Sequence, residues 1–418
     1  MGGNVVFWMQ PMPQFLIRRR RVWYAILEIP KSLRPIFGKS RFKQTLETES
    51  LSLAENRVRP VIVEWKRIIE FARSGDHTSL EAKVFRWRGL IEEERRAGRN
   101  EDEIREISLD VIDTTEESLV HEISFGKKHL LSERIGSYLA SMDVEPKTLD
   151  AARKSIGRFT KQFKFAHEAT KRTVINWVED DLIRKQGLSA TTCRSIISYC
   201  RGYWAWLERH HDLELAAPFS GVVPSAKKAR KTEIQDRRKH LGKEDIRKLI
   251  QAAAAQGDDD LADLITLAAH TGCRIAELCG LKLENVSEST FKIVDAKTEA
   301  GWRSIPIHSA IKQLVARLVN TSKDGYLLSG LTFNKYGDRS NAIGKRFGRL
   351  KTSLGYGPDH VFHSIRKGVA TQLETANVPE NVSARILGHD LKTMSYGLYS
   401  GGVSEDVLRN AIEELKWG

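Results

Sequence analysis

The sequence contains few cysteines. Its 418 residues include four, Cys193, Cys200, Cys273 and Cys279, with no Cys-x-x-Cys pair and no spacing typical of a metal site. This pattern argues against a disulfide scaffold and a zinc-binding module, and it predicts reduced, mostly buried thiols in a cytoplasmic protein. The histidines also lack carboxylate or thiol partners at ligand spacing, so neither a metal ion nor another cofactor is expected.

The sequence also lacks a segment suited to a membrane. The apolar stretch from Val5 to Ile17 is interrupted by Pro11 and Pro13 and is too short to span a bilayer. Arg18 to Arg21 follow this stretch instead of preceding it, which is the opposite order to a secretory signal. Neither export nor membrane association is therefore predicted.

The surplus of positive charge is the main feature of the composition. There are 67 Lys and Arg against 54 Asp and Glu, giving a net charge of +13. Such a surplus attracts a polyanion, although charge alone does not separate DNA from RNA or an acidic membrane. The length exceeds that of one ordinary hydrophobic core, so two or three domains are expected.

A group of residues near the C-terminus suggests chemistry at a phosphate. His363 and Arg366 lie three residues apart at the start of a predicted helix, and Gly388-His389 follows at the end of another. Tyr399 comes ten residues after His389. An arginine offers two oxygens a fixed fork of donors, a histidine offers a proton or a hydrogen bond, and a phenol offers a nucleophile.

A second group lies upstream. Arg274 and Glu277 are three residues apart on a predicted helix that opens after Thr271-Gly272, so the carboxylate can orient the guanidinium. Between the two groups, the β-rich runs around a Glu-Ala-Gly turn in residues 291–308 predict a hairpin with Lys297 near its tip.

The ordered set of these residues resembles the catalytic domain of the tyrosine recombinases, the phage integrase family. The set is Arg274, Lys297, His363, Arg366, His389 and Tyr399, with Glu277 as an orienting residue. The resemblance implies a site-specific recombinase that cuts and rejoins DNA through a 3′-phosphotyrosyl ester, without metal or ATP. It also implies the integrase of a phage or other mobile element, located in the bacterial cytoplasm and associated with the nucleoid when bound to DNA.

Several alternatives stay open at this point. Tyr396 competes with Tyr399 as nucleophile, although Tyr399 lies closer to the last helix, where the family places its tyrosine. A type IB topoisomerase-like relaxase would share the chemistry but would not exchange strands between sites. A catalytically silent DNA-binding or directionality factor could retain the scaffold, although the intact residue set argues against it.

The predicted fold is mainly α-helical with small β-sheets and is multidomain. Residues 1–75 are predicted to form a β-hairpin and a helix, which resemble the arm-type DNA-binding module of phage integrases. Residues 76–130 are predicted to form a charged helical spacer. Residues 131–223 carry four helical patterns, similar to the SAM-like core-binding domain of the family. A basic linker, 224–240, precedes the mixed α/β catalytic domain, 241–418.

The resemblance also implies specific partners. These are double-stranded DNA at attachment-type core sites, with arm sites as a further option, and DNA-bending accessory proteins. A tetramer of the chain is expected on DNA and a monomer when free. The residues expected to face DNA are Lys147, Thr148, Arg153, Lys154, Lys227, Lys228, Arg230 and Lys231. The linker could equally be only solvated, the N-terminal hairpin could merely pack on the chain, and the last helix could dock in cis or onto a neighbouring protomer.

Overall fold

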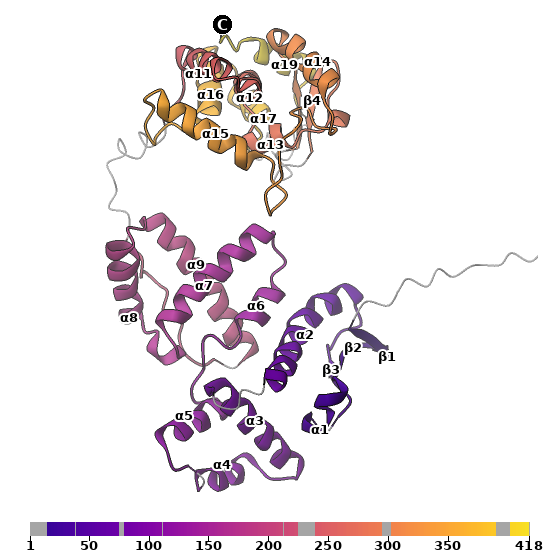
Figure 1. Cartoon of the computed structure of the whole chain (residues 1–418), viewed down its shortest axis with the longest axis vertical. Coiled ribbons are helices and arrows are strands. Elements are labelled where there is room, and N and C mark those ends of the chain that lie inside the picture. The colour runs from indigo at the N-terminus through magenta and orange to yellow at the C-terminus, as the bar shows by residue number, and fades with distance from the viewer. Residues whose placement is uncertain are drawn as a thin grey trace, which may run out of the picture. The chain divides into compact units, whose positions relative to one another are not determined.

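The computed structural model describes residues 15–37, 39–74, 79–110, 112–211, 213–224, 239–294, 302–389 and 402–417. The chain divides into two units, residues 1–227 and 228–418, and each consists mostly of helices with a small sheet (Figure 1). The predicted fold class is therefore confirmed. The division between the units falls within the segment predicted to be a linker.

The first unit begins with a three-stranded antiparallel sheet in the order β1-β2-β3. Its strands are β1 (Leu16–Arg19), β2 (Val22–Glu28) and β3 (Arg41–Thr45), with two short helical segments, η1 (Lys31–Leu33) and α1 (Arg34–Phe37), between β2 and β3. Helix α2 (Leu51–Ser74) packs against the sheet through a shared apolar core. The sequence predicted β2, β3 and α2 but not β1, because two of the four consecutive arginines occupy that strand.

Three short helices follow, α3 (Leu80–Arg96), α4 (Glu101–Leu109) and α5 (Thr115–Ser124). Asn100 and Thr114 begin α4 and α5 with reciprocal capping hydrogen bonds from side chain to backbone. Their charged surface matches the sequence pattern, but Val84, Val120 and Ile123 also form a small core with Leu130 and Phe165. The spacer predicted from charge alone is thus a packed helical unit.

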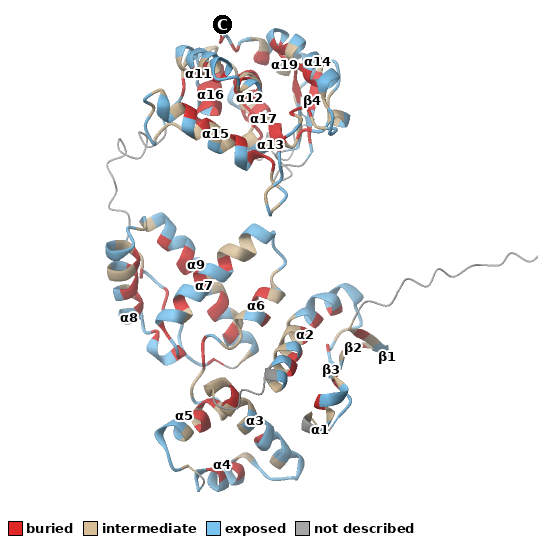
Figure 2. Cartoon of the chain, in the orientation of Figure 1, coloured by how far each residue is buried: buried red, intermediate tan, exposed pale blue. Residues whose placement is uncertain are grey.

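The four helical patterns predicted for residues 131–223 form one core. They correspond to α6 (Ile135–Ser141), α7 (Pro146–Gln162), α8 (Lys171–Asn176) continuing into the π-helical segment η3 (Trp177–Lys185), and α9 (Ala190–His210). Phe159 and Trp204 are fully buried between the helices, as the burial colouring of α7 and α9 illustrates (Figure 2). The buried hydroxyl of Tyr203 donates a hydrogen bond of 2.7 Å to the carbonyl oxygen of Leu131.

The second unit is built around α12 (Asp259–Thr271), whose apolar residues are almost all buried. Helices α11 (Lys243–Ala255), α15 (Ser340–Ser353) and α16 (His363–Thr375) contact it. The predicted hairpin is present as β4 (Thr290–Ile293) paired with β5 (Arg303–Pro306). The remaining elements are α13 (Ile275–Cys279), η4 (Leu283–Asn285), η6 (Ser309–Ile311), α14 (Lys312–Thr321), α17 (Glu380–Leu387) and α19 (Glu405–Glu413).

The C-terminal helix α19 docks in cis. Ile412, Leu415 and Trp417 are buried in the same core as α12. His308, after β5, donates its Nε2 proton to the carbonyl oxygen of Leu415 at 3.0 Å, while its Nδ1 accepts from the amide of Ala310. Of the two arrangements that the sequence left open for this helix, this structure contains the intramolecular one.

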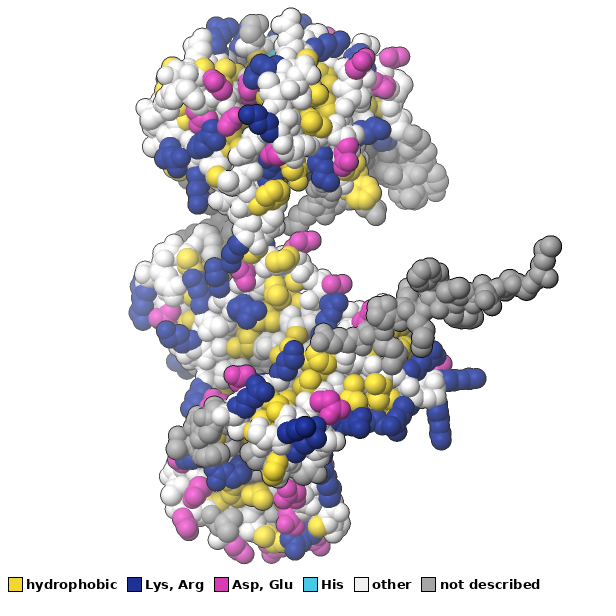
Figure 3. All heavy atoms as spheres, turned by 45° about the vertical axis from the view of Figure 1, so that its right-hand side comes forward, with side chains coloured by type: hydrophobic (Ala, Val, Ile, Leu, Met, Phe, Trp, Pro, Cys, Tyr) yellow, Lys and Arg dark blue, Asp and Glu magenta, His cyan; other side chains and the backbone are white. Residues whose placement is uncertain are grey.

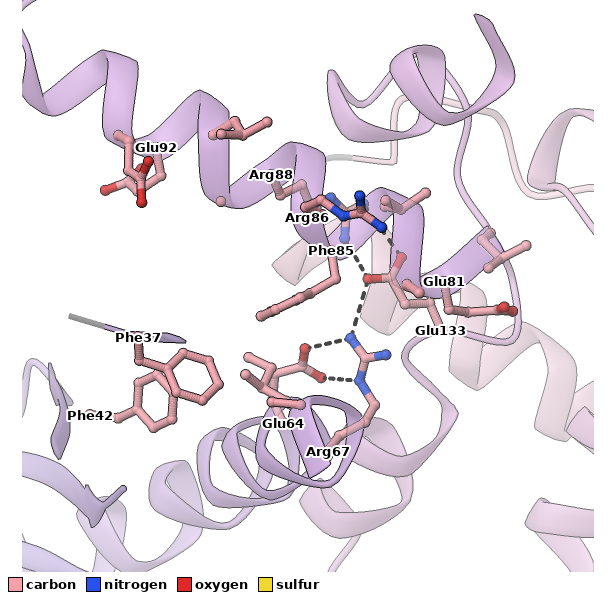
Figure 4. A pocket seen from close by; sticks show the side chains of 18 of the residues that line it. Phe37, Phe42, Glu64, Arg67, Glu81, Phe85, Arg86, Arg88, Glu92 and Glu133 are labelled. Atoms are coloured by element: carbon pink, nitrogen blue, oxygen red, sulfur yellow. Dashed lines mark hydrogen bonds and ion pairs between the residues drawn. The ribbon is translucent and has the colours of Figure 1, made fainter. Parts of the chain in front are cut away.

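An ionic cluster joins α2, α3 and the turn before α6 in the first unit. The Glu133 carboxylate, 9% exposed, contacts Arg88 at 2.5 Å, Arg134 at 3.3 Å and Arg67 at 3.6 Å. Glu64 binds Arg67 through two hydrogen bonds (Figure 4). The cluster borders a pocket of about 860 Å³ that is lined by α2, α3 and the sheet, and none of the predicted site residues lines it.

We predict that Glu133→Gln destabilises the first unit. Burial by itself raises the pKa of Glu133, but Arg134, Arg88 and Arg67 outweigh it and hold the pKa below its usual value. An amide in its place would leave Arg88 without a carboxylate, whereas Arg67 and Arg134 would keep their ion pairs with Glu64. The free energy of unfolding in urea should therefore fall by about 2 kcal/mol, somewhat less than for fully buried pairs because the arginines are partly exposed. Glu116→Gln, which removes only the half-exposed pair with Lys83, is the matched control and should cost less than about 0.5 kcal/mol. Equal losses for the two variants would contradict the prediction.

Candidate active site

The end of α12 positions the first arginine of the site. The helix stops at Gly272, which has a left-handed backbone with φ of 65°. A Cβ atom there would lie 2.7 Å from Leu387 and 3.1 Å from Val369, so both conformation and space require glycine. The chain then turns, and Arg274 is the residue directly before α13.

Glu277 is the buried carboxylate of the site, with a side chain 5% exposed. It accepts hydrogen bonds from the backbone amide of Arg274 at 2.8 Å and from the Arg274 guanidinium at 2.7 Å. It also accepts from Arg303 at 2.9 Å. Glu277, predicted to be an orienting residue, therefore contacts Arg274 directly.

Arg366 lies in the first turn of α16 and is 4% exposed. Its guanidinium donates a hydrogen bond of 2.8 Å to the carbonyl oxygen of Gly272 and a second hydrogen bond to the carbonyl oxygen of Leu387. These acceptors belong to the C-terminal ends of α12 and α17, where unpaired carbonyls carry partial negative charge that stabilises a buried cation. His363, one turn earlier on α16, is exposed.

The C-terminal end of α17 carries the last histidine. Gly388 ends the helix with a left-handed φ of 64°, and its carbonyl oxygen accepts from Arg274 at 3.2 Å. His389 follows directly. Arg274 and Arg366 therefore bind the neighbouring carbonyls of Gly388 and Leu387 at the end of α17, which brings residues from three separate stretches of sequence into one site.

The site carries an excess of positive charge. Arg274, Arg303 and Arg366 surround the one carboxylate of Glu277 among the described residues of this cluster. Burial, followed by the neighbouring Arg274 and Arg303, lowers the pKa of Arg366 to about 10. Burial by itself raises the pKa of Glu277, but hydrogen bonds from Arg303 and Arg274 outweigh it, so the carboxylate stays ionised. A cluster with this balance favours an anionic ligand.

Of the six predicted catalytic residues, the structure brings together Arg274, His363, Arg366 and His389. Lys297 and Tyr399, together with the competing Tyr396, lie outside the described residues, as do Lys227, Lys228, Arg230 and Lys231 of the linker. The other residues predicted to face DNA lie on α7, where Lys147, Arg153 and Lys154 are exposed and Thr148 is half-buried.

Sequence reasoning missed Arg303. This residue begins β5, and the side-chain alternation of a strand places it on the same face as Ile305 and Ile307, which are fully buried. Its side chain is 6% exposed. A lone charge on an apolar strand face requires a buried partner, and that pattern in the sequence could have identified it.

Two kinds of feature are absent from the described part of the chain. No group of three or more His, Cys, Asp or Glu residues among the described residues is arranged to hold a metal ion. None of the helices among these residues is long and apolar enough to cross a membrane.

Comparison with known families finds two matching regions in the chain. Residues 239–400 match the phage integrase family, a range that contains all six predicted catalytic residues. Residues 15–74, which comprise the N-terminal sheet and α2, match a domain of unknown function, DUF6538. The second match assigns no activity to the N-terminal module.

Individual recombinases and integrases are also similar to the chain in sequence or fold. The tyrosine recombinase XerA of Pyrococcus horikoshii is 25% identical over 296 residues, covering 68% of this chain and 94% of its own length. The XerA of Pyrococcus furiosus is 22% identical over 273 residues, covering 63% of this chain and 87% of its own length. A lambda integrase dimer bound to a COC′ core site has a similar fold, with a TM-score of 0.51 at 16% identity over 95% of this chain and 99% of the other. A lambda integrase (75–356) dimer bound to a COC′ core site has a TM-score of 0.50 at 18% identity, over 66% of this chain and 97% of the other.

Fold, site and relatives together define the class of the protein, which is an enzyme that carries out site-specific DNA recombination. Residues 239–400 of the chain match the phage integrase family, and the curated proteins similar to the chain are tyrosine recombinases.

We predict that His389 is neutral at pH 7 in the DNA-free protein. Partial burial of the ring, followed by the charges of Arg366, Arg274, His363 and Arg303, lowers its pKa below the ordinary 6.5. A bound anion offsets these charges and should raise the pKa, so anion affinity should increase as pH falls through the titration of His389. Imidazole NMR with and without sulfate measures both effects, and His389→Gln identifies the signal. A pKa above 6.5 in anion-free buffer would refute the prediction.

Proposed function

We propose that this chain is the integrase of a phage or other mobile element, and that it cuts and rejoins DNA at specific sites through a 3′-phosphotyrosyl intermediate. The observation that carries the proposal is the cationic cluster of Arg274 and Arg366 beside His389, held by one buried carboxylate. A DNA phosphate supplies the anion that this cluster favours, and the chemistry requires neither a metal ion nor ATP.

The two arginines perform the electrostatic part of the reaction. Attack on a phosphodiester gathers negative charge on the non-bridging oxygens, and donors fixed in advance around those oxygens stabilise the transition state. Arg274 retains an exposed side, 41% of its side chain, from which it can bind a phosphate while Glu277 holds it in place. Arg366 is anchored by two backbone carbonyls and supplies a fixed positive charge beside it.

The proposed chemical step transfers the phosphoryl group of one strand from its 5′ oxygen to the tyrosine oxygen. The Tyr399 phenol oxygen forms a bond to phosphorus, and the bond between phosphorus and the 5′ oxygen breaks. Lys297 gives a proton to the leaving 5′ oxygen, and a neutral imidazole, His363 or His389, receives the phenol proton. The ester retains the bond energy, so a free 5′ hydroxyl of another strand can reverse the reaction and complete the exchange.

The stoichiometry of exchange implies four copies of the chain. Recombination of two duplexes cuts four strands, and each chain supplies one tyrosine, so we propose a tetramer on DNA formed from free monomers. Duplex DNA as the partner agrees with the lambda integrase dimers on core sites that share this fold. The exposed Lys147, Arg153 and Lys154 of α7 provide positive charge for the phosphate backbone.

The central test replaces the nucleophile. Tyr399→Phe should abolish the covalent protein–DNA adduct on a nicked suicide substrate, because the ring remains but the attacking oxygen is gone. Affinity for the uncut duplex should stay within about threefold, since the arginine cluster and α7 are untouched. Adducts are counted by denaturing gel electrophoresis.

Tyr396→Phe is the matched control and should retain the adduct. An adduct formed by the Tyr399→Phe protein would overturn the assignment, and loss of the adduct only in Tyr396→Phe would transfer the role to that residue. Recombination between two sites, measured beside relaxation of a single supercoiled circle, separates an integrase from a relaxase.

The N-terminal module is proposed to bind a second, arm-type stretch of DNA. On the sheet, Arg41 and Lys43 are exposed, and the Lys43 ammonium lies 4.6 Å from the ring centroid of Tyr24. The opposite face of the sheet is closed by α2. Lys and Arg side chains are spread over the visible surface, which includes the N-terminal module (Figure 3).

We predict that Arg41→Ala combined with Lys43→Ala weakens binding to random-sequence duplex and reduces the salt dependence of that binding. Each lost phosphate contact should lower the slope of log K against log salt by about 0.9, hence by about 1.8 for the pair. Arg95→Ala with Arg99→Ala is the control, because these arginines pair with Glu101 and Glu94 at 2.6 and 2.5 Å, whereas the pair of Arg41 with Glu28 is 3.8 Å long. An unchanged slope in the Arg41 and Lys43 variant would remove the sheet from the DNA-binding surface.

A further inference from the structure

Arg303 is a buried charge that the proposed chemistry does not use. It lies on β5, on a strand face otherwise occupied by Ile305 and Ile307. Burial of a guanidinium costs several kcal/mol unless its donors are satisfied. An apolar residue would fill this position on a strand at lower cost, so the presence of arginine here requires another explanation.

The contacts of Arg303 connect the two halves of the site. Its two terminal nitrogens donate to the two oxygens of Glu277, at 3.3 and 2.9 Å, and its Nε donates to the carbonyl oxygen of Ile386 at 2.7 Å. Glu277 is the carboxylate that holds Arg274, and Ile386 lies in the last turn of the helix that leads to His389.

Gly388 lies in close contact with the guanidinium of Arg303. A Cβ atom on residue 388 would lie 2.7 Å from Nη1 and 3.0 Å from Cζ of Arg303. The left-handed φ of 64° independently favours glycine at this position. The guanidinium thus lies against the turn between α17 and His389, where any displacement would shift both Gly388, which accepts from Arg274, and the histidine.

We infer that Arg303 is a positioning residue for the active site, which fixes Glu277 and the C-terminal end of α17 and thereby sets the guanidinium of Arg274 and the imidazole of His389 around the scissile phosphate. This inference rests on the proposed function. The planar fork of arginine is needed because three donors must reach a carboxylate and a carbonyl in fixed directions. Lysine, a single ammonium, keeps the charge but cannot make the same set of bonds.

The test measures single-turnover adduct formation by the full chain on a nicked suicide substrate. Arg303→Met should lower the rate about 100-fold, the size expected when catalytic groups are misplaced by about 1 Å. Affinity for the uncut duplex should change less than about threefold. Arg303→Lys should recover only part of the rate, and Arg317→Met, which removes an exposed pair with Asp263 in the same unit, should react as the unmodified protein does.

A double-mutant cycle with Arg274→Lys distinguishes positioning from a purely structural role. If Arg303 acts through Arg274, its replacement should slow the reaction much less once Arg274 has been changed. A global loss of stability would instead slow both backgrounds by the same factor, and that additive result would overturn the inference. Should Arg303→Met fail to fold, the cycle with Arg303→Lys decides the question in the same way.

The outcomes also separate this inference from the proposed function. If the unmodified protein forms no adduct on DNA, the proposed function fails. If it forms the adduct and both Arg303 variants react within about threefold of it, only the role of Arg303 is refuted.

Discussion

The site depends on one buried carboxylate. Glu277 binds the backbone and guanidinium of Arg274 and the guanidinium of Arg303. In an environment of low dielectric, an ion pair that satisfies its hydrogen bonds restricts geometry strongly, because each alternative arrangement leaves a buried charge without a partner. With three guanidinium groups nearby and one negative charge, the cluster is held in place and yet retains net positive charge for a ligand.

The ends of two helices complete this balance. The carbonyl oxygens of Gly272 and Leu387, at the C-terminal ends of α12 and α17, accept hydrogen bonds from Arg366, and that of Gly388 accepts from Arg274. Unpaired carbonyls at a helix end need donors, and buried guanidinium groups need acceptors. The guanidinium groups supply the donors for the carbonyls, and the carbonyls supply the acceptors for the guanidinium groups. The two left-handed glycines, 272 and 388, end these helices where the arginines can reach the carbonyls.

Periodicity in the sequence was sufficient for most of the fold. The stripes of α7 and α9 predicted the helical core of residues 131–223, and the β-rich runs predicted β4 and β5. Strand β1 was missed because an arginine run lacks the alternation of a strand, and it forms only by pairing with β2. The packing of α3, α4 and α5 was also hidden, since their few buried residues leave little signal in a charged segment.

For the site, the sequence by itself determined the chemical groups and their order. Arg274, Glu277, His363, Arg366 and His389 could be named from short local spacings, and the family match rests on the same information. Only the tertiary structure decided that Arg303, 26 residues from Glu277 and 83 from Ile386, belongs with them. It also decided that the last helix packs on its own unit. The physical reason is that local spacing fixes which side chains share a face of one element, whereas contacts between elements depend on how the whole core packs.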